Sequence, residues 1–150
     1  MKVHKTRERG SQLVEAAAMM VPFLALAFLV LDAGWAVFVK ATLQTAVREA
    51  TRYGVTGQPG SAIQGVAQQY ALGLLSGSQA GTLSISCWNP ANSKPNPADT
   101  TGCGVGGNVV EVSVQGYQVS PLAPLLRSAV PINVTVNAAD IIEGSPAPPQ

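Results

Sequence analysis

The chain has 150 residues, of which 47% are hydrophobic and only 11% are charged, and its formal net charge is +1. This length accommodates one membrane segment and one small soluble domain. Beyond its first ten residues the chain has fewer cations than carboxylates, so the composition excludes the basic surface that binding to nucleic acid requires.

The first ten residues form a basic leader that carries a net charge of +3. The rest of the chain carries a net charge of −2, so the basic character of the protein comes from the leader. A segment of this length is too short to fold alone. By the positive-inside rule the leader stays in the cytoplasm, and the chain beyond the following apolar run lies outside the membrane.

An apolar run follows the leader and opens on Gly10-Ser11-Gln12-Leu13-Val14-Glu15. Residues 16–31 carry no charge, and about 20 helical residues at 1.5 Å each cross the hydrocarbon core of a bilayer. The stretch from Ala16 to about Trp35 is therefore long enough to span it. A carboxylate such as Glu15 is costly at this depth and usually marks a function, the alternative being an interfacial carboxylate without a partner.

Residues 11–54 are predicted to form one long helix whose second half extends outside the membrane. Polar side chains recur four residues apart on one side of this second half, which predicts an amphipathic surface helix that Gly54 ends. The apolar side is the expected packing face and consists of Trp35, Val39, Leu43, Ala46, Val47, Ala50 and Tyr53.

The remaining residues predict a small extracytoplasmic domain over residues 55–143. A second helix is expected at 61–77, where Ser61 and Gln64 fit a capping box. Alternating polar and β-branched residues predict strands, and proline-rich segments predict an apolar helical turn and a disordered tail. The strands lie at 82–87, 110–115 and 132–136, the turn at 120–126 and the tail at 144–150. We expect an α+β fold with a long N-terminal helix and a short antiparallel sheet.

The two cysteines, Cys87 and Cys103, both follow the apolar run and flank a loop rich in proline, asparagine and glycine. Outside the cytoplasm the redox environment favours a disulfide, so we expect these residues to be bonded rather than to remain two free thiols.

The segment Thr42-Leu43-Gln44-Thr45-Ala46-Val47-Arg48-Glu49-Ala50-Thr51-Arg52-Tyr53, together with Glu15 at the start of the apolar run, resembles the TadE-like family. The resemblance implies a minor pseudopilin of the Tad (Flp) pilus, a member of the type IV pilin class that is held in the bacterial inner membrane. A prepilin peptidase would cut between Gly10 and Ser11, leaving Glu15 as the acidic position used in assembly. The implied partners are other pilin subunits, the pilus assembly platform and the lipid bilayer.

One departure from the wider class concerns Ala16, because the major Flp pilins carry tyrosine after the acidic residue. This difference disfavours the major subunit and leaves the minor-pseudopilin interpretation intact. Two other interpretations remain open. The apolar run could be an ordinary secretory signal that releases a soluble binding domain, or it could anchor an envelope protein that is never cut.

Catalysis, metal binding and cofactor binding are not expected. The only histidine, His4, lies in the leader, so no Ser–His or Cys–His pair can form in the external domain. Two cysteines without histidine make a poor metal site. Residues 102–107 match G-x-G-x-x-G by letter, but the strand, helix and acidic residue of a dinucleotide-binding unit do not surround them.

Overall fold

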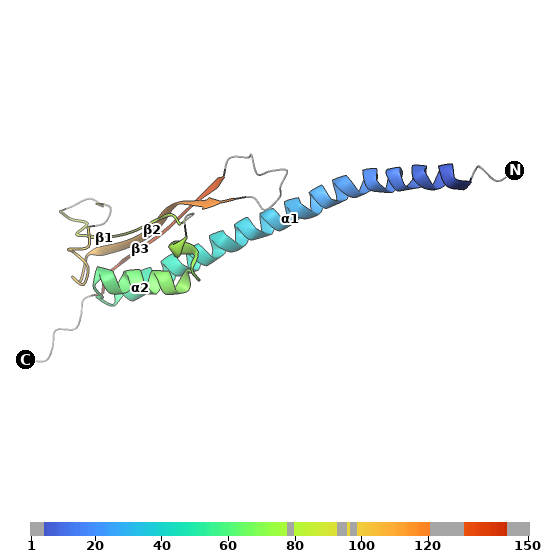
Figure 1. Ribbon diagram of the computed structural model, residues 1–150. Coiled ribbons are helices and arrows are strands. Elements are labelled where there is room, and N and C mark those ends of the chain that lie inside the picture. The colour runs from blue at the N-terminus through green and yellow to red at the C-terminus, as the bar shows by residue number, and fades with distance from the viewer. Residues whose placement is uncertain (1–4, 78–79, 93–95, 97–98, 121–130, 144–150) are drawn as a thin grey trace, which may run out of the picture. The chain divides into compact units, whose positions relative to one another are not determined.

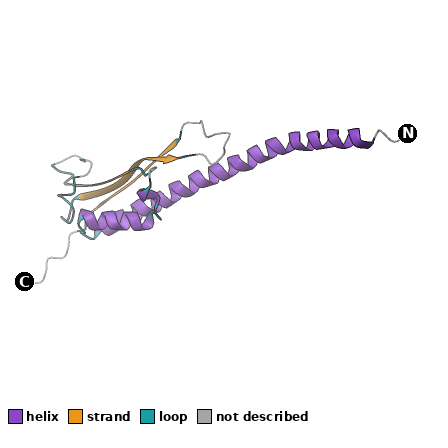
Figure 2. Ribbon diagram, in the orientation of Figure 1, coloured by secondary structure: helices purple, strands orange, loops and turns teal. Residues whose placement is uncertain are grey.

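The computed structural model describes residues 5–77, 80–92, 96, 99–120 and 131–143, with side chains from residue 12 onward. The expected turn at 120–126, apart from Ser120, and the expected tail at 144–150 lie outside the described residues. In chain order the elements are α1 (Lys5–Val55), α2 (Gly60–Tyr70), the 3-10 helix η1 (Leu74–Ser76), β1 (Thr82–Trp88), β2 (Val109–Val119) and β3 (Ile132–Ile141) (Figures 1 and 2). This is the α+β fold that the sequence predicts.

Helix α1 is longer than expected at both ends. It begins at Lys5 rather than Ser11, and it continues through Pro22. Gly54 does not end it but lies buried in its last turn, where a Cβ atom would come within 3.0 Å of the Ile63 and Val110 side chains. The glycine therefore permits a close approach between α1 and its neighbours.

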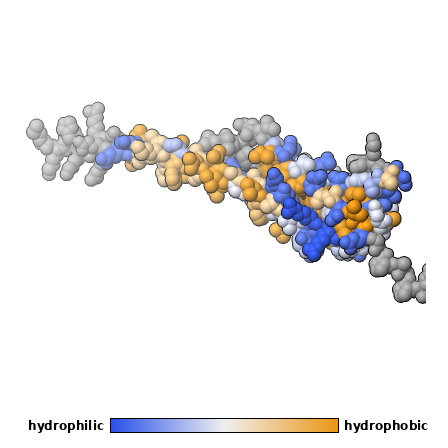
Figure 3. Space-filling view, turned by 180° about the vertical axis from the view of Figure 1, so that it is seen from behind, coloured by the Kyte–Doolittle hydropathy of each residue, from blue (hydrophilic) through white to orange (hydrophobic). Residues whose placement is uncertain are grey.

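The described residues divide into two units, and the boundary falls inside α1 between Ala36 and Val37. In the first unit the large apolar side chains are exposed, for example Leu13 at 73% and Phe23 at 71%. Figure 3 shows hydrophobic residues predominating over this N-terminal part of α1. The helix is long and apolar enough to cross a membrane, and none of its most apolar 18-residue window is buried.

The second unit has its own hydrophobic core. Its sheet has the order β1-β2-β3 with both pairs antiparallel, and the C-terminal part of α1 and helix α2 lie on one face of it (Figure 1). Burying a valine or leucine side chain contributes about 1.5–3 kcal/mol, so this layer supplies most of the stability of the unit. The fully buried side chains include Val39, Leu43, Val47, Ile63, Val110, Val112 and Val114.

The end of α1 is also hydrogen-bonded to β3 and to the residues that follow it. The Thr51 hydroxyl lies 2.9 Å from the Val47 carbonyl within α1 and 3.3 Å from the Ala138 carbonyl of β3, and the Glu143 backbone N–H donates to the Val55 carbonyl at 3.0 Å. The last two of these contacts join segments that are far apart in the sequence. They fix the position of the last turns of α1 over the sheet.

All three strands extend beyond their predicted ends, β1 only by Trp88. In β2 the alternation breaks at Gly116, whose φ is +69°, and the register with β3 shifts between Val114 and Tyr117. This is a β-bulge, after which the strand resumes and again buries Tyr117 and Val119. Strand β3 continues to Ile141 because it pairs with the whole of β2, although its sequence no longer alternates.

The prediction for the second helix was wrong at both of its ends. Helix α2 begins at Gly60 with Pro59 at its N-cap, so Ser61 lies within the first turn and no side-chain cap is formed. It ends at Tyr70 because the backbone turns left-handed at Leu72 and Gly73, with φ values of +51° and +81°. A short 3-10 helix then replaces the last part of the expected helix.

Two glycine-to-alanine substitutions are expected to change stability in opposite directions. A Cβ atom at Gly116 or at Gly65 would meet no heavy atom within 4 Å, so only backbone preference differs between the two positions. Gly116→Ala should lower the free energy of unfolding by about 1–2 kcal/mol because alanine disfavours a left-handed backbone. Gly65→Ala, inside α2, should raise it by about 0.5–1 kcal/mol.

Urea denaturation of the full chain in detergent, followed by near-ultraviolet circular dichroism, measures both changes. Equal shifts for the two variants would contradict the bulge geometry.

Candidate functional site

The first candidate site is the N-terminal end of α1, where the predicted processing and assembly residues lie. Gly10 and Ser11 are within the helix, and Glu15 lies four residues after Ser11, which is about 6 Å along the axis. The side chain of Glu15 is exposed. It stands at the start of an apolar surface that no other described part of the chain covers.

The predicted packing face of α1 falls partly inside the core of the second unit. Val39, Leu43 and Val47 are buried there, as are Ala46 and Ala50. Trp35 belongs to the first unit and is 40% exposed, and Tyr53 is 38% exposed. The buried stripe therefore begins at Val39, and Tyr53 lies at its edge, where it lines a pocket.

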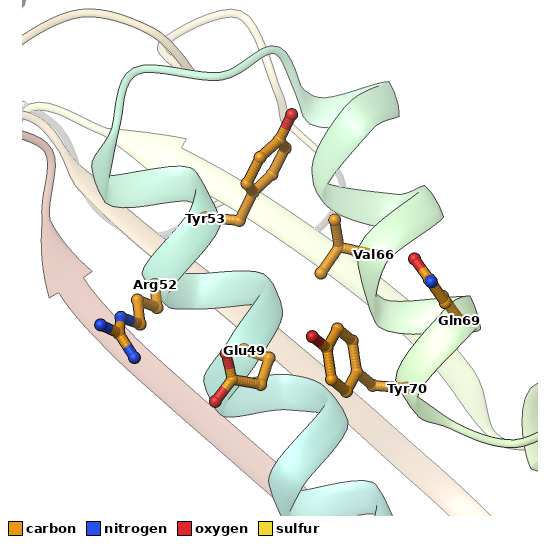
Figure 4. Close-up of a pocket in the computed structure, with 6 residues that line it drawn as sticks. All are labelled: Glu49, Arg52, Tyr53, Val66, Gln69 and Tyr70. Carbon is orange, nitrogen blue, oxygen red and sulfur yellow. The ribbon is translucent and has the colours of Figure 1, made fainter.

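This pocket lies between α1 and α2 and has a volume of about 350 Å³. Figure 4 shows Tyr53 and Tyr70 on either side of Val66, with Glu49 and Arg52 on the α1 side. We call it the tyrosine pocket, and Gln69 completes its lining. Figure 4 shows the Arg52 guanidinium pointing away from α2, so two aromatic rings and one carboxylate make the pocket an amphipathic contact surface.

A second depression continues along the same helix pair and is more apolar. It has a volume of about 570 Å³ and shares Gln69 and Tyr70 with the tyrosine pocket, so the two are continuous. We call it the apolar groove. Its lining consists of Phe38, Ala41, Thr42, Thr45, Gln69, Tyr70 and Leu72.

The two threonines of the apolar groove add little polarity to it. The Thr42 hydroxyl donates to the Phe38 carbonyl at 2.9 Å, and the Thr45 hydroxyl donates to the Ala41 carbonyl at 3.0 Å. Because their hydrogen bonds are satisfied within α1, these side chains can present their methyl groups to an apolar neighbour at low cost.

Leu72 is the most unusual residue of the apolar groove, and sequence reasoning missed it. It is 73% exposed, and it is the only non-glycine residue with positive φ among the described residues. A left-handed backbone conformation destabilises a residue with a Cβ atom by about 1–2 kcal/mol. Because the leucine side chain is exposed, burial of that side chain does not offset this cost. In the sequence, the Leu72-Gly73 pair indicates that the helix could end here, because glycine favours a left-handed backbone. The pair does not indicate on which surface of the domain Leu72 lies.

The loop between β1 and β2 is held by the predicted disulfide, which the structure contains between Cys87 and Cys103. The Cys87 backbone N–H also donates to the Asp99 carbonyl at 2.8 Å. The hydroxyl and then the backbone N–H of Thr101, both donating to the Asp99 carboxylate, lower the pKa of that group below its ordinary value. These contacts tie Asp99 and Cys103 to the end of β1. Within the described ranges, no cluster of three His, Cys, Asp or Glu residues could hold a metal ion.

Comparison with known proteins gives one family match, and the matched residues all lie in helix α1. Residues 10–52 match the model of a family described as TadE-like protein, so this part of the chain is similar to that family, as the sequence motif predicts. The family is associated with the Tad pilus and is structural. The match begins at Gly10, includes Glu15 and ends beside Tyr53. No curated protein and no solved structure matches the chain.

We predict that Leu72→Asn stabilises the domain although it removes an apolar side chain. Asparagine tolerates a left-handed backbone better than leucine, and an exposed leucine loses little when it is replaced. The free energy of unfolding should rise by about 0.5–1 kcal/mol, measured by urea denaturation of the full chain in detergent. A drop of similar size would mean that Leu72 contributes to the core.

Proposed function

We propose that the chain is a minor pseudopilin of a Tad (Flp) pilus that acts in pilus assembly and so in surface adherence. The observation that carries the proposal is the TadE-like match, because it begins at the predicted cleavage glycine and spans the whole apolar segment. In this proposal α1 anchors the protein in the bacterial inner membrane. The leader faces the cytoplasm and the β-sheet domain lies outside.

Processing between Gly10 and Ser11 would create the chemistry that assembly needs. Glycine offers a scissile bond without an obstructing side chain, and the cut leaves a new α-amine on Ser11 with an ordinary pKa near 8. Glu15 is one helical turn away. A carboxylate at the centre of a membrane helix costs about 2.5–3.5 kcal/mol on insertion scales, and pairing it with an amine of the same or a neighbouring subunit reduces such a cost.

The apolar part of α1 supports association with other membrane helices. Its exposed surface includes the small side chains of Ala16, Ala17 and Ala18 directly after Glu15. Small residues allow helix backbones to approach closely in lipid, where packing rather than the hydrophobic effect holds helices together. Other pilin subunits and the assembly platform are the partners that this surface would contact.

The first test is the N-terminus of the mature protein, measured by intact mass and N-terminal sequencing of material from the native membrane. We expect it to begin at Ser11, and Gly10→Val should block the cut because a branched side chain obstructs the scissile bond. An N-terminus beyond residue 31 would instead indicate a secretory signal. An intact leader in the unaltered protein would indicate an anchored envelope protein that is never cut.

The second test separates assembly from processing. Glu15→Gln should leave cleavage unchanged and reduce the amount of sheared pili at least tenfold, equivalent to about 1.4 kcal/mol of lost pairing. Glu143→Gln is the matched control, because this carboxylate is also exposed but lies far along the chain, beyond β3. Wild-type pilus levels with Glu15→Gln would contradict the pairing role.

A further inference from the structure

We propose that the apolar groove is a second, peripheral membrane contact, and that Phe38, Tyr70 and Leu72 rest in the outer headgroup region of the same bilayer that α1 spans. The inference rests on the proposed membrane anchor. It assigns a lipid surface, rather than a protein or a small molecule, as the occupant of this groove.

The first argument is the position of the groove within the domain. Helix α2 runs back alongside α1, so that Tyr70 and Leu72 at its C-terminal end line the same groove as Phe38 (Figure 1). Phe38 is the second residue of the domain unit, which begins at Val37. The groove is therefore at the end of the domain from which the chain enters the apolar segment.

The second argument is continuity with the apolar segment along one helix. Phe38 follows Trp35 by three residues, which is about 4.5 Å along α1. Each interfacial layer of a bilayer is about 5–8 Å thick, so a span that ends near Trp35 leaves Phe38 within the headgroup layer. Tyr70 and Leu72 line the same groove as Phe38.

The third argument is the chemistry of the exposed side chains. Val37 and Leu72 are exposed at 68% and 73%, and Phe38 and Tyr70 at 48% and 46%. Aromatic rings with a polar tip are enriched where headgroups meet acyl chains, and exposed aliphatic side chains gain by entering that layer. Lys40, exposed two residues after Phe38, can reach anionic headgroups.

The fourth argument is that polarity rises with distance from this end. Glu49 and Arg52 line the tyrosine pocket, 11 and 14 residues beyond Phe38 on α1. At 1.5 Å per residue they lie about 16–21 Å from Phe38 along the helix. Leu72 keeps a left-handed backbone that the fold does not require of a leucine. A lipid contact would give this exposed apolar side chain a favourable neighbour.

The experiment uses the full chain reconstituted in bilayers of zwitterionic and anionic phospholipid. Both native cysteines are in the disulfide, so one introduced cysteine carries a nitroxide spin label. The labelled variants are Leu72→Cys, Leu24→Cys in the apolar segment, and Val105→Cys as a matched control. Val105 is 54% exposed, in the loop that leads into β2. The measurement compares collisions with oxygen, which concentrates in lipid, and with a water-soluble nickel chelate.

We expect the oxygen-to-nickel ratio at Leu72 to lie well above that at Val105 and below that at Leu24. A ratio at Leu72 equal to that at Val105 would overturn the inference while leaving the anchor intact. Low collision rates with both reagents at Leu72 would also overturn it, because they would indicate cover by protein. A water-like ratio at Leu24 would instead remove the anchor itself, and the proposed function with it.

Discussion

The structure depends on one constraint: the two halves of a single helix, α1, are in different environments. One half packs against the sheet and the other half exposes its apolar side chains. From Val39 onward α1 buries an apolar stripe against the valines of the sheet, and this packing defines the domain. Over residues 16–31 the same helix carries no charge, and none of its most apolar 18-residue window is buried among the described residues. The second half therefore specifies the fold, and the first half has the length and composition of a membrane anchor.

The small domain follows from the stripe on α1. Helix α2 and the three strands complete a core of leucine, isoleucine and valine, and the disulfide closes the long loop at one edge. In the chain-entropy model a loop of about 15 residues gains about 3 kcal/mol from such closure, which is substantial for a domain of this size. Two features of its surface are the tyrosine pocket and the apolar groove, both lined largely by side chains suited to contact.

Much of this arrangement can be predicted from the sequence because periodicity reports burial. The alternation of Val110, Val112 and Val114 located β2, and the compartment implied by the basic leader predicted the Cys87–Cys103 bond. The TadE-like motif can be recognised in the sequence because its residues follow one another along a single helix. Prediction failed where tertiary contacts override local pattern. Gly116 looks like the end of a strand but forms a bulge, and the pairing partner extends β3 beyond its alternating residues.

The groove could not be predicted for a related reason. Phe38 and Leu72 are 34 positions apart in the chain, and only the return of α2 along α1 brings them to one surface. The sequence placed Leu72 inside a continuing helix, where it would have had no special role. Its left-handed backbone, set by the end of α2, changes both its direction and its exposure.

The most direct measurement of the central claim is alkaline carbonate extraction of membranes from cells that make the full chain. Carbonate releases peripheral and soluble proteins but leaves proteins with a spanning helix in the pellet. The account predicts that the protein stays in the pellet together with an integral membrane marker. Recovery of the domain in the supernatant would show that the apolar half of α1 does not hold it in lipid, which would contradict the account.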